Sequence, residues 1–271
     1  MTGRVEGKVA FITGAARGQG RAHAVRLAEE GADIIAMDLL EPLEHVRYPG
    51  SSKEDMDETV RLVEATGRRI VARQGDVRSL ESVREVVDEG VIAMGGRLDI
   101  VCANAGIMIL HEWSEGTPEL WDATIATNLT GVWNTVMATA QHLIDAGGGS
   151  MILTSSSAGL RGQPFLNPYV AAKHGVVGVM RAFAVELAEY GIRVNTIHPT
   201  GVNTTMIEGL GDAYPTFLEH HPSLALVAKN LLDVPAVEAT DLAQAVVYLA
   251  SDESRYVTAT TLTVDAGITQ H

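Results

Sequence analysis

The residues Thr13-Gly14-Ala15-Ala16-Arg17-Gly18-Gln19-Gly20 join a short apolar run, Val9–Thr13, to an amphipathic stretch, Gln19–Glu30. A glycine-rich turn between a strand and a helix lets the backbone approach a pyrophosphate, which then lies at the helix N-terminus. The spacing here, G-x3-G-x-G, differs from the common G-x-G-x-x-G fingerprint, and a plain strand-to-helix turn would also use glycine. Its position after the first strand favours a dinucleotide site.

On both sides of this turn, short β-branched or apolar runs alternate with longer helical patterns. Such alternation predicts an α/β Rossmann fold, a doubly wound parallel sheet with helices on both faces. No linker or repeat interrupts it, so residues 1–271 are expected to form a single domain. The expected strands are Val9–Thr13, Ile34–Asp38, Arg69–Gln74, Leu98–Ala103, Ser150–Thr154, Arg193–Ile197 and Thr261–Val264. The expected helices are Gln19–Glu30, Asp55–Ala65, Leu80–Met94, Pro118–Ala146, Pro168–Tyr190 and Asp241–Ser251.

Composition excludes several classes of protein. The net charge of −14 argues against nucleic acid or an anionic membrane as a partner. The single cysteine, Cys102, lies in an apolar run and is expected to be a buried, inert thiol. No secretory signal and no stretch of the roughly 18 apolar residues that a membrane span needs is evident. We therefore expect a cytoplasmic protein with no membrane partner.

Ligands of parallel sheets bind beyond the carboxyl ends of the strands. Asp38 ends the second expected strand, where a carboxylate accepts hydrogen bonds from a ribose diol and repels a 2′-phosphate. Arg17 favours NADP instead, because a basic residue in the glycine turn could bind that phosphate. The charge of Asp38 would lie directly against the phosphate, so the sequence favours NAD over NADP.

Tyr169 and Lys173 are four residues apart and would share one face of a helix, and Ser156 precedes the tyrosine by thirteen residues. A free phenol has a pKa of about 10. A nearby ammonium should lower that pKa and allow the phenol to act as a base toward an alcohol. Ser156 would hold the substrate oxygen. This set predicts alcohol/carbonyl redox chemistry.

Over nearly its full length the chain resembles the short-chain dehydrogenase/reductase family. The resemblance rests on the glycine turn, Asp76-Val77, Asn104-Ala105-Gly106, Asn128, Ser156, Tyr169-x3-Lys173 and the final Leu249-Ala250-Ser251-Asp252 and Val264-Asp265-Ala266-Gly267. It implies a seven-stranded sheet of order 3-2-1-4-5-6-7 and a homotetramer.

The resemblance also implies residue roles. Asn128 would break its helix and hold a water that relays protons through Lys173, so the catalytic set is Asn128, Ser156, Tyr169 and Lys173. The candidate cofactor-binding residues are Gly14, Arg17, Gly18, Gln19, Gly20, Asp38, Leu39, Asp76, Val77, Asn104, Ala105, Gly106, Tyr169, Lys173, Pro199, Thr200, Val202 and Thr204.

The chain departs from the family pattern in two places. Pro199-Thr200-Gly201 stands where Pro-Gly is usual, which would put a side chain beside the nicotinamide. A loop of about residues 39–53 is inserted after the second strand. It would lie at the adenosine end of the cofactor, either as a clamp or as an exposed decoration. With His198–Thr204, it is similar to the mycofactocin-associated, carveol-dehydrogenase-like branch, which implies non-exchangeable NAD(H) and a redox peptide carrier.

Three loops should set specificity: residues 107–111, residues 160–165 and a lid of about residues 203–232. They are apolar and lack an arginine placed for an anionic substrate, which favours a small apolar secondary alcohol and its ketone, such as carveol. His111, His220 and His221 lack a metal-ligand pattern, so we expect surface positions and no metal. The alternatives are an ordinary exchangeable-NAD(P) 3-ketoacyl or hydroxysteroid-type reductase and a non-catalytic NAD(H) sensor. An enoyl reductase is disfavoured by the Tyr169-x3-Lys173 spacing.

Overall fold

A seven-stranded, all-parallel sheet forms the centre of the molecule, in the order β3-β2-β1-β4-β5-β6-β7. The computed structural model describes residues 3–270, apart from the side chains of residues 226 and 228. The strands are β1 (Val9–Thr13), β2 (Asp33–Asp38), β3 (Ile70–Gln74), β4 (Ile100–Ala103), β5 (Gly149–Thr154), β6 (Ile192–Pro199) and β7 (Thr261–Val264). The predicted Rossmann fold and strand order are confirmed.

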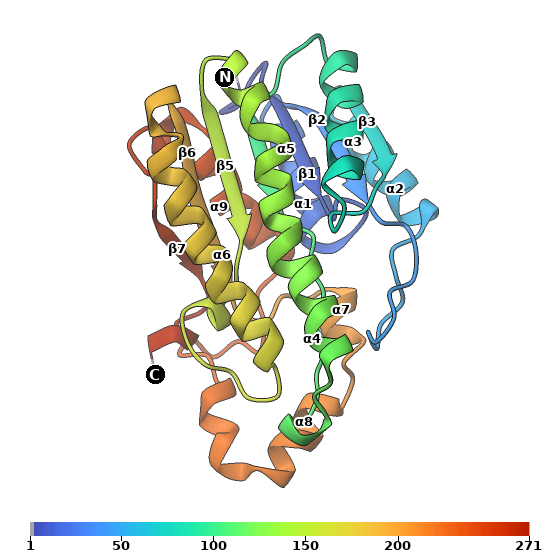
Figure 1. Cartoon of the computed structure of the whole chain (residues 1–271), viewed down its shortest axis with the longest axis vertical. Helices are drawn as coiled ribbons and strands as arrows, with labels where there is room; N and C mark the ends of the chain where they lie inside the picture. The colour runs from blue at the N-terminus through green and yellow to red at the C-terminus, as the bar shows by residue number, and fades with distance from the viewer. Residues whose placement is uncertain (1–2, 271) are drawn as a thin grey trace.

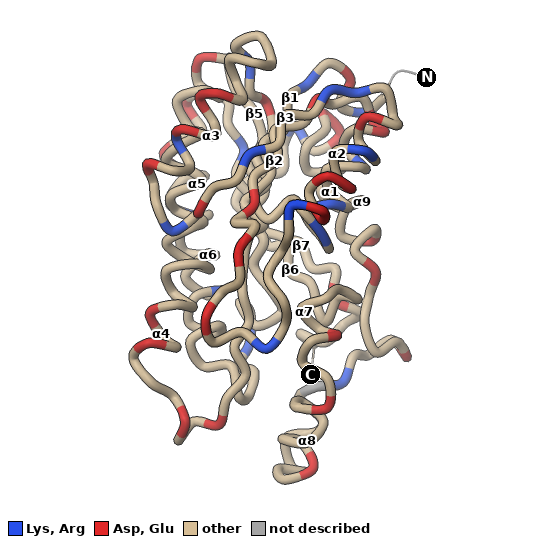
Figure 2. Tube along the Cα trace, turned by 90° about the vertical axis from the view of Figure 1, so that its right-hand side faces the viewer, with Lys and Arg blue, Asp and Glu red and all other residues tan. Residues whose placement is uncertain are grey.

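Helices cover both faces of this sheet (Figure 1), and Figure 2 shows the sheet between the two helical layers. One layer holds α3 (Leu80–Ala93), α4 (Pro118–Ile125), α5 (Gly131–Asp145) and α6 (Asn167–Glu186). The other holds α1 (Gly18–Glu29), α2 (Lys53–Glu64) and α9 (Ala239–Ala250). Each layer packs its apolar side chains on one sheet face, which gives two large hydrophobic clusters.

The bounds of the predicted helices agree with the structure within a few residues, with one helix divided in two. The single helix expected over Pro118–Ala146 is divided by a π-helical turn, Ala126–Thr130, which contains Asn128 and confirms the expected break. Ser52 and Asp55 form a capping box at the start of α2.

Two irregular segments extend beyond the carboxyl ends of the strands. The insertion, residues 39–52, contains no helix or strand and runs from β2 to α2. The lid contains α7 (Thr205–Glu208), α8 (Ala213–His220) and the 3-10 helix Pro222–Ala228, at the same end of the molecule (Figure 1). Within residues 3–270, no helix combines the length and apolar character that a membrane crossing requires.

Candidate active site

The glycine turn has the close approaches that a dinucleotide site needs. Gly14 has a φ of +66°, and a Cβ there would lie 2.9 Å from the Cα of Ala105. A Cβ on Gly20 would lie 1.9 Å from the carbonyl oxygen of Gly14, so only glycine lets α1 begin this close to β1. Asn104 joins the ends of β1 and β4, since its Nδ2 donates to the carbonyl of Thr13 at 3.1 Å.

A cleft opens beyond the strand ends, and most of the predicted nucleotide residues line it. These are Gly14, Arg17, Gly18, Gln19, Asp38, Leu39, Asp76, Val77, Asn104, Ala105, Gly106 and Thr204. Among the residues described, Gly20, Tyr169, Lys173, Pro199, Thr200 and Val202 are outside its lining.

Two of the residues outside the lining have other partners. Thr200 Oγ1 donates to Oδ1 of Asn230 at 2.8 Å, so this hydroxyl holds the end of the lid. Val202 is buried in the core and bridges to Val237.

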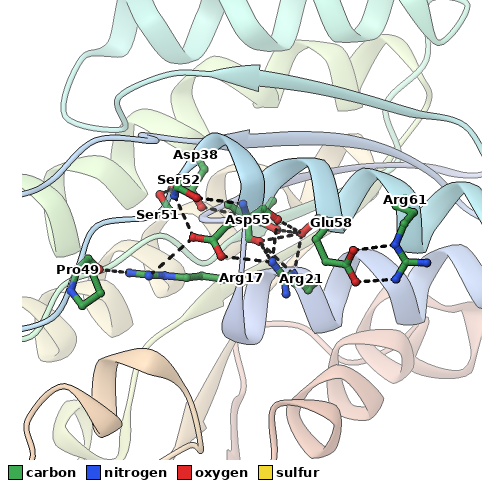
Figure 3. Close-up of polar contacts among 12 residues, drawn as sticks. Arg17, Arg21, Asp38, Pro49, Ser51, Ser52, Asp55, Glu58 and Arg61 are labelled. Atoms are coloured by element: carbon green, nitrogen blue, oxygen red, sulfur yellow. Dashed lines mark hydrogen bonds and ion pairs between the residues drawn. The ribbon is translucent and has the colours of Figure 1, made fainter.

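Asp38 and Arg17 are both held by the insertion or its flanking helix (Figure 3). The carboxylate of Asp38 accepts hydrogen bonds from the backbone N–H of Ala16 at 2.9 Å and of Leu39 at 2.8 Å, and from the hydroxyl of Ser51 at 2.6 Å. Arg17 donates to the carbonyl oxygen of Pro49 and lies 4.0 Å from Asp55. The guanidinium of Arg17 is therefore bound to protein oxygens. This agrees with the prediction that Asp38, rather than Arg17, sets the preference between NAD and NADP.

Asp76 lines the cleft, and Nη2 of Arg78 lies 2.6 Å from its carboxylate. Partial burial favours the neutral acid, but hydrogen bonds and charge from Arg78 outweigh it and lower the pKa of Asp76. The carboxylate is thus ionised and already paired.

Gly106 connects the nucleotide cleft with the predicted catalytic group. It lines the cleft, and a Cβ at this position would lie 2.7 Å from Oδ1 of Asn128 and 3.6 Å from Nζ of Lys173. The buried amide of Asn128 exchanges two hydrogen bonds with the backbone of Ile107, at 3.0 and 2.9 Å. The buried ammonium of Lys173 donates to the carbonyl of Thr154 at 2.8 Å.

The acid–base properties of this group differ from the expectation. Burial raises the pKa of Tyr169, while a hydrogen bond from Ser156 opposes the rise. Burial also lowers the pKa of Lys173 to about 8. The prediction that the pKa of Tyr169 lies below its ordinary value is therefore wrong for this structure, because desolvation of the phenolate is the largest effect.

Ser156 is fixed by its backbone as well as its side chain. Its Oγ accepts a hydrogen bond from the N–H of Ala158 at 3.1 Å, and its carbonyl accepts one from Nδ1 of His198 at 2.7 Å. Burial lowers the pKa of His198 to about 4, so the imidazole is neutral. Donation to a carbonyl requires the proton on Nδ1, which leaves Nε2 to accept from the hydroxyl of Thr196 at 2.8 Å.

The three loops expected to set specificity meet around Tyr169 in a third hydrophobic cluster. Its buried members are Met108, Leu110, Leu166 and Leu210, and Phe165, Tyr169, Val170, Met206, Ile207, Ala213, Tyr214 and Phe217 pack against them. Arg161, in the second loop, donates to the carbonyls of Val227 and Ile268. The expectation that His111 lies on the surface is wrong, because it is 3% exposed.

Orphaned polar atoms in the cleft fit a bound cofactor. Gln19 Oε1 and Thr127 Oγ1 are buried and, among the described residues, have no hydrogen-bond partner. Buried polar atoms without partners are rare in proteins, and a ligand is a common explanation. Both residues line the cleft, where a dinucleotide with its many polar atoms could satisfy them.

Comparisons with known proteins agree with this geometry. Residues 14–269 match the family model described as Enoyl-(Acyl carrier protein) reductase. A (−)-trans-carveol dehydrogenase of Rhodococcus erythropolis is 47% identical over 276 residues, covering 98% of this chain and 99% of that protein. The chain belongs to the short-chain dehydrogenase/reductase family.

Two solved structures of short-chain dehydrogenases superpose closely. One, from Mycobacterium paratuberculosis and bound to NAD, has a TM-score of 0.97 and 52% identity, covering 99% of this chain and 100% of the other. A carveol dehydrogenase from Mycobacterium avium in complex with NAD has a TM-score of 0.92 and 49% identity, with both chains covered in full.

The insertion of this short-chain dehydrogenase/reductase forms part of the cleft wall. Glu41, Leu43, Val46, Tyr48, Gly50 and Ser51 of the insertion line the cleft, and none of them was predicted individually. The sequence offered one signal, an aromatic residue within a loop rich in proline and glycine. The burial of Tyr48 argues against an exposed decoration.

Proposed function

We propose that this protein is an NAD-dependent dehydrogenase that interconverts a small apolar secondary alcohol and its ketone. One observation carries the proposal: Gly106 lines the nucleotide cleft and also lies beside Asn128 and Lys173, next to the cluster that contains Tyr169. The names of the carveol dehydrogenases support an alcohol of this class.

In this mechanism the chain positions the alcohol and moves its proton. Bound NAD supplies a hydride acceptor at nicotinamide C4. Ser156 holds the alcohol oxygen by hydrogen bond, and the phenolate oxygen of Tyr169 takes the hydroxyl proton as the carbinol C–H bond breaks. Lys173, with its charge about 5.5 Å from the ring of Tyr169, stabilises the phenolate. The apolar cluster excludes water from the reacting atoms.

The raised pKa of Tyr169 fits a role that depends on the bound cofactor. Without a ligand, burial favours the neutral phenol. The nicotinamide ring of NAD carries a positive charge, which would favour the phenolate when the cofactor binds beside it. Cofactor binding would thereby favour the ionised form of Tyr169 that accepts the proton.

We further propose that the insertion retains NAD between turnovers and that electrons pass to an external carrier of the mycofactocin type. The contacts of Ser51 with Asp38 and of Arg17 with Pro49 support a closed loop over the adenosine end. A buried dinucleotide dissociates slowly, because these contacts must break before it leaves.

Exposed apolar side chains support a homotetramer. Trp121, Trp133 and Met137 on α4 and α5 are 38–45% exposed, and Val185 on α6 is 77% exposed. Such side chains on adjoining helices suit a helix-to-helix interface between copies of the chain. Light scattering at several concentrations tests this assembly.

The experiment that tests the cofactor proposal is mass spectrometry of the nucleotide released on denaturing the extensively dialysed protein. Near-stoichiometric NAD(H), with turnover in the presence of an artificial electron acceptor, supports retention. An empty protein that turns over with added NAD indicates an ordinary dehydrogenase. NADP(H) would contradict the assignment of Asp38, and absence of any turnover would favour a sensor.

A further inference from the structure

Tyr48 differs from the rest of the insertion. It is 8% exposed, whereas every other residue of the segment 41–50 is exposed or half-buried. An aromatic side chain that leaves a surface loop and becomes buried is held by what it contacts, and its contacts therefore indicate its role.

On one side, Tyr48 contacts the loop that follows β4. Its phenol oxygen accepts a 3.0 Å hydrogen bond from the backbone N–H of Met108, and this bond is buried. Met108 belongs to the apolar cluster that includes Tyr169 and the lid. The insertion thus reaches the apolar cluster where we place the substrate.

On the other side, Tyr48 packs against the lid. A Cβ added to Gly209, directly after α7, would lie 2.3 Å from the Cβ of Tyr48 and 3.0 Å from its Cα. Gly209 follows β6, and Met108 follows β4. Tyr48 therefore lies between the loop that follows β4 and the end of α7, and Figure 1 shows the insertion descending toward α7.

The remainder of the insertion is fixed at its base. Ser51 donates to Asp38 at 2.6 Å, and Nε2 of Gln74 donates to the carbonyl of Leu39 at 3.0 Å and to Glu41 at 2.9 Å. Tyr48 is thus carried on a segment that is attached to β2 and β3 and cannot shift freely.

The phenol of Tyr48 is unsuited to proton transfer. Burial raises its pKa to about 12, the hydrogen bond from Met108 opposes the rise, and Tyr169 adds to it. At the pH of any ordinary assay the group is neutral, so it acts by its shape and by accepting the N–H of Met108.

We propose that Tyr48 is a positioning residue that sets the distance between the Met108 loop and α7 and thereby the size of alcohol that the site accepts. The proposal rests on the function proposed above and extends it: the insertion serves the substrate end of the cleft as well as the adenosine end. The hydrogen bond to Met108 and the close approach of the Tyr48 Cβ to Gly209 connect the insertion to these two segments.

The test uses Tyr48→Phe, which removes only the acceptor for Met108, and Tyr48→Ala, which removes the ring as well. Tyr256→Phe is the matched control, because Tyr256 is 89% exposed. The first measurement is hydrogen exchange by mass spectrometry on peptides covering residues 104–112 and 205–212. The second is steady-state kinetics on secondary alcohols of increasing size, with the bound nucleotide quantified in each variant.

For Tyr48→Phe we expect faster exchange at residues 104–112 and a KM for the alcohol raised by about five- to tenfold, from the loss of one buried hydrogen bond. The value of kcat, its pH profile and the bound nucleotide should be unchanged. Tyr48→Ala keeps the Cβ that lies beside Gly209 but leaves the volume of the ring empty, so it should in addition raise exchange at residues 205–212 modestly and shift kcat/KM toward bulkier alcohols. The control should match the wild type.

Two results would overturn the inference. One is that hydrogen exchange stays unchanged in both peptides and in both variants. This result would count against the inference even if the protein turns over no alcohol. The other is unchanged KM and size preference with a loss of bound nucleotide, which would make Tyr48 a nucleotide cover alone. A wild type without turnover, but with the expected exchange, would instead count against the proposed reaction.

Discussion

The ammonium of Lys173 lies 5.5 Å from the centroid of the Tyr169 ring and is hydrogen-bonded to the carbonyl of Thr154. The two residues are four apart on α6. The ammonium of Lys173 donates its hydrogen bond to Thr154 and acts on the ring of Tyr169 by its charge. Both groups are desolvated, and burial shifts each pKa toward the neutral form.

Lys173→Met should separate catalysis from stability. Burial lowers the folded-state pKa of Lys173 from 10.5 to about 8. Below pH 8 the ammonium is charged in both states, and its burial in the folded protein lowers the free energy of unfolding. We expect turnover to fall by about 100-fold or more. We also expect an increase in unfolding free energy of about 2 kcal/mol near neutral pH, which shrinks as the pH rises above 8. Denaturant unfolding at several pH values checks this; a destabilisation independent of pH would contradict it.

His23→Leu should stabilise the protein, most of all in acid. His23 is fully buried in α1, neither ring nitrogen has a partner among the described residues, and burial lowers its pKa to about 3. Between pH 6.5 and about 3, the His23 side chain is protonated in the unfolded chain but neutral in the folded protein. The free energy of unfolding therefore decreases by about 1.4 kcal/mol for each unit by which the pH is lowered in this range. Thermal unfolding of the variant should lose part of this slope, whereas the exposed His220→Leu should keep it. An unchanged slope in the first variant argues against the buried neutral imidazole.

Glycine substitutions in two helices should have opposite effects. Gly20→Ala places a Cβ 1.9 Å from the carbonyl of Gly14 and should lower the unfolding free energy by more than about 2 kcal/mol, with loss of bound nucleotide. At Gly178, in α6, no atom of the described residues lies within 4 Å of an added Cβ, so Gly178→Ala should stabilise the chain by about 0.5–1 kcal/mol. Calorimetry of both variants is the measurement. Equal effects would mean that the turn tolerates a wider approach of α1 to β1.

Asp38→Ser should relax the preference for NAD. Removal of the carboxylate removes the repulsion of a 2′-phosphate at the end of β2, and like charges at close range cost several kcal/mol. The ratio of kcat/KM for NADP to that for NAD should rise at least about tenfold. Asp57→Ser, on the exposed face of α2, is the control. A ratio unchanged by Asp38→Ser would move cofactor selection to another residue.

The sheet and the nucleotide turn could be predicted because they depend on local periodicity and on glycine spacing. The helix break at Asn128 was expected from the family resemblance instead, and in the structure it is a π-helical turn. The role of Tyr48 could not be predicted, because an irregular loop has no period that says which side chain turns inward. The burial of His111 and the direction of the Tyr169 pKa shift depend on packing between distant segments.

The most direct test of the account is a single-turnover reaction of the NAD-loaded protein with a secondary alcohol deuterated at its carbinol carbon. We predict one equivalent of ketone, with the deuterium recovered on the reduced nicotinamide. Tyr169→Phe should form product at least about 100-fold more slowly with the same nucleotide content. Product formation by Tyr169→Phe at the wild-type rate would contradict the assignment of Tyr169 as the proton acceptor.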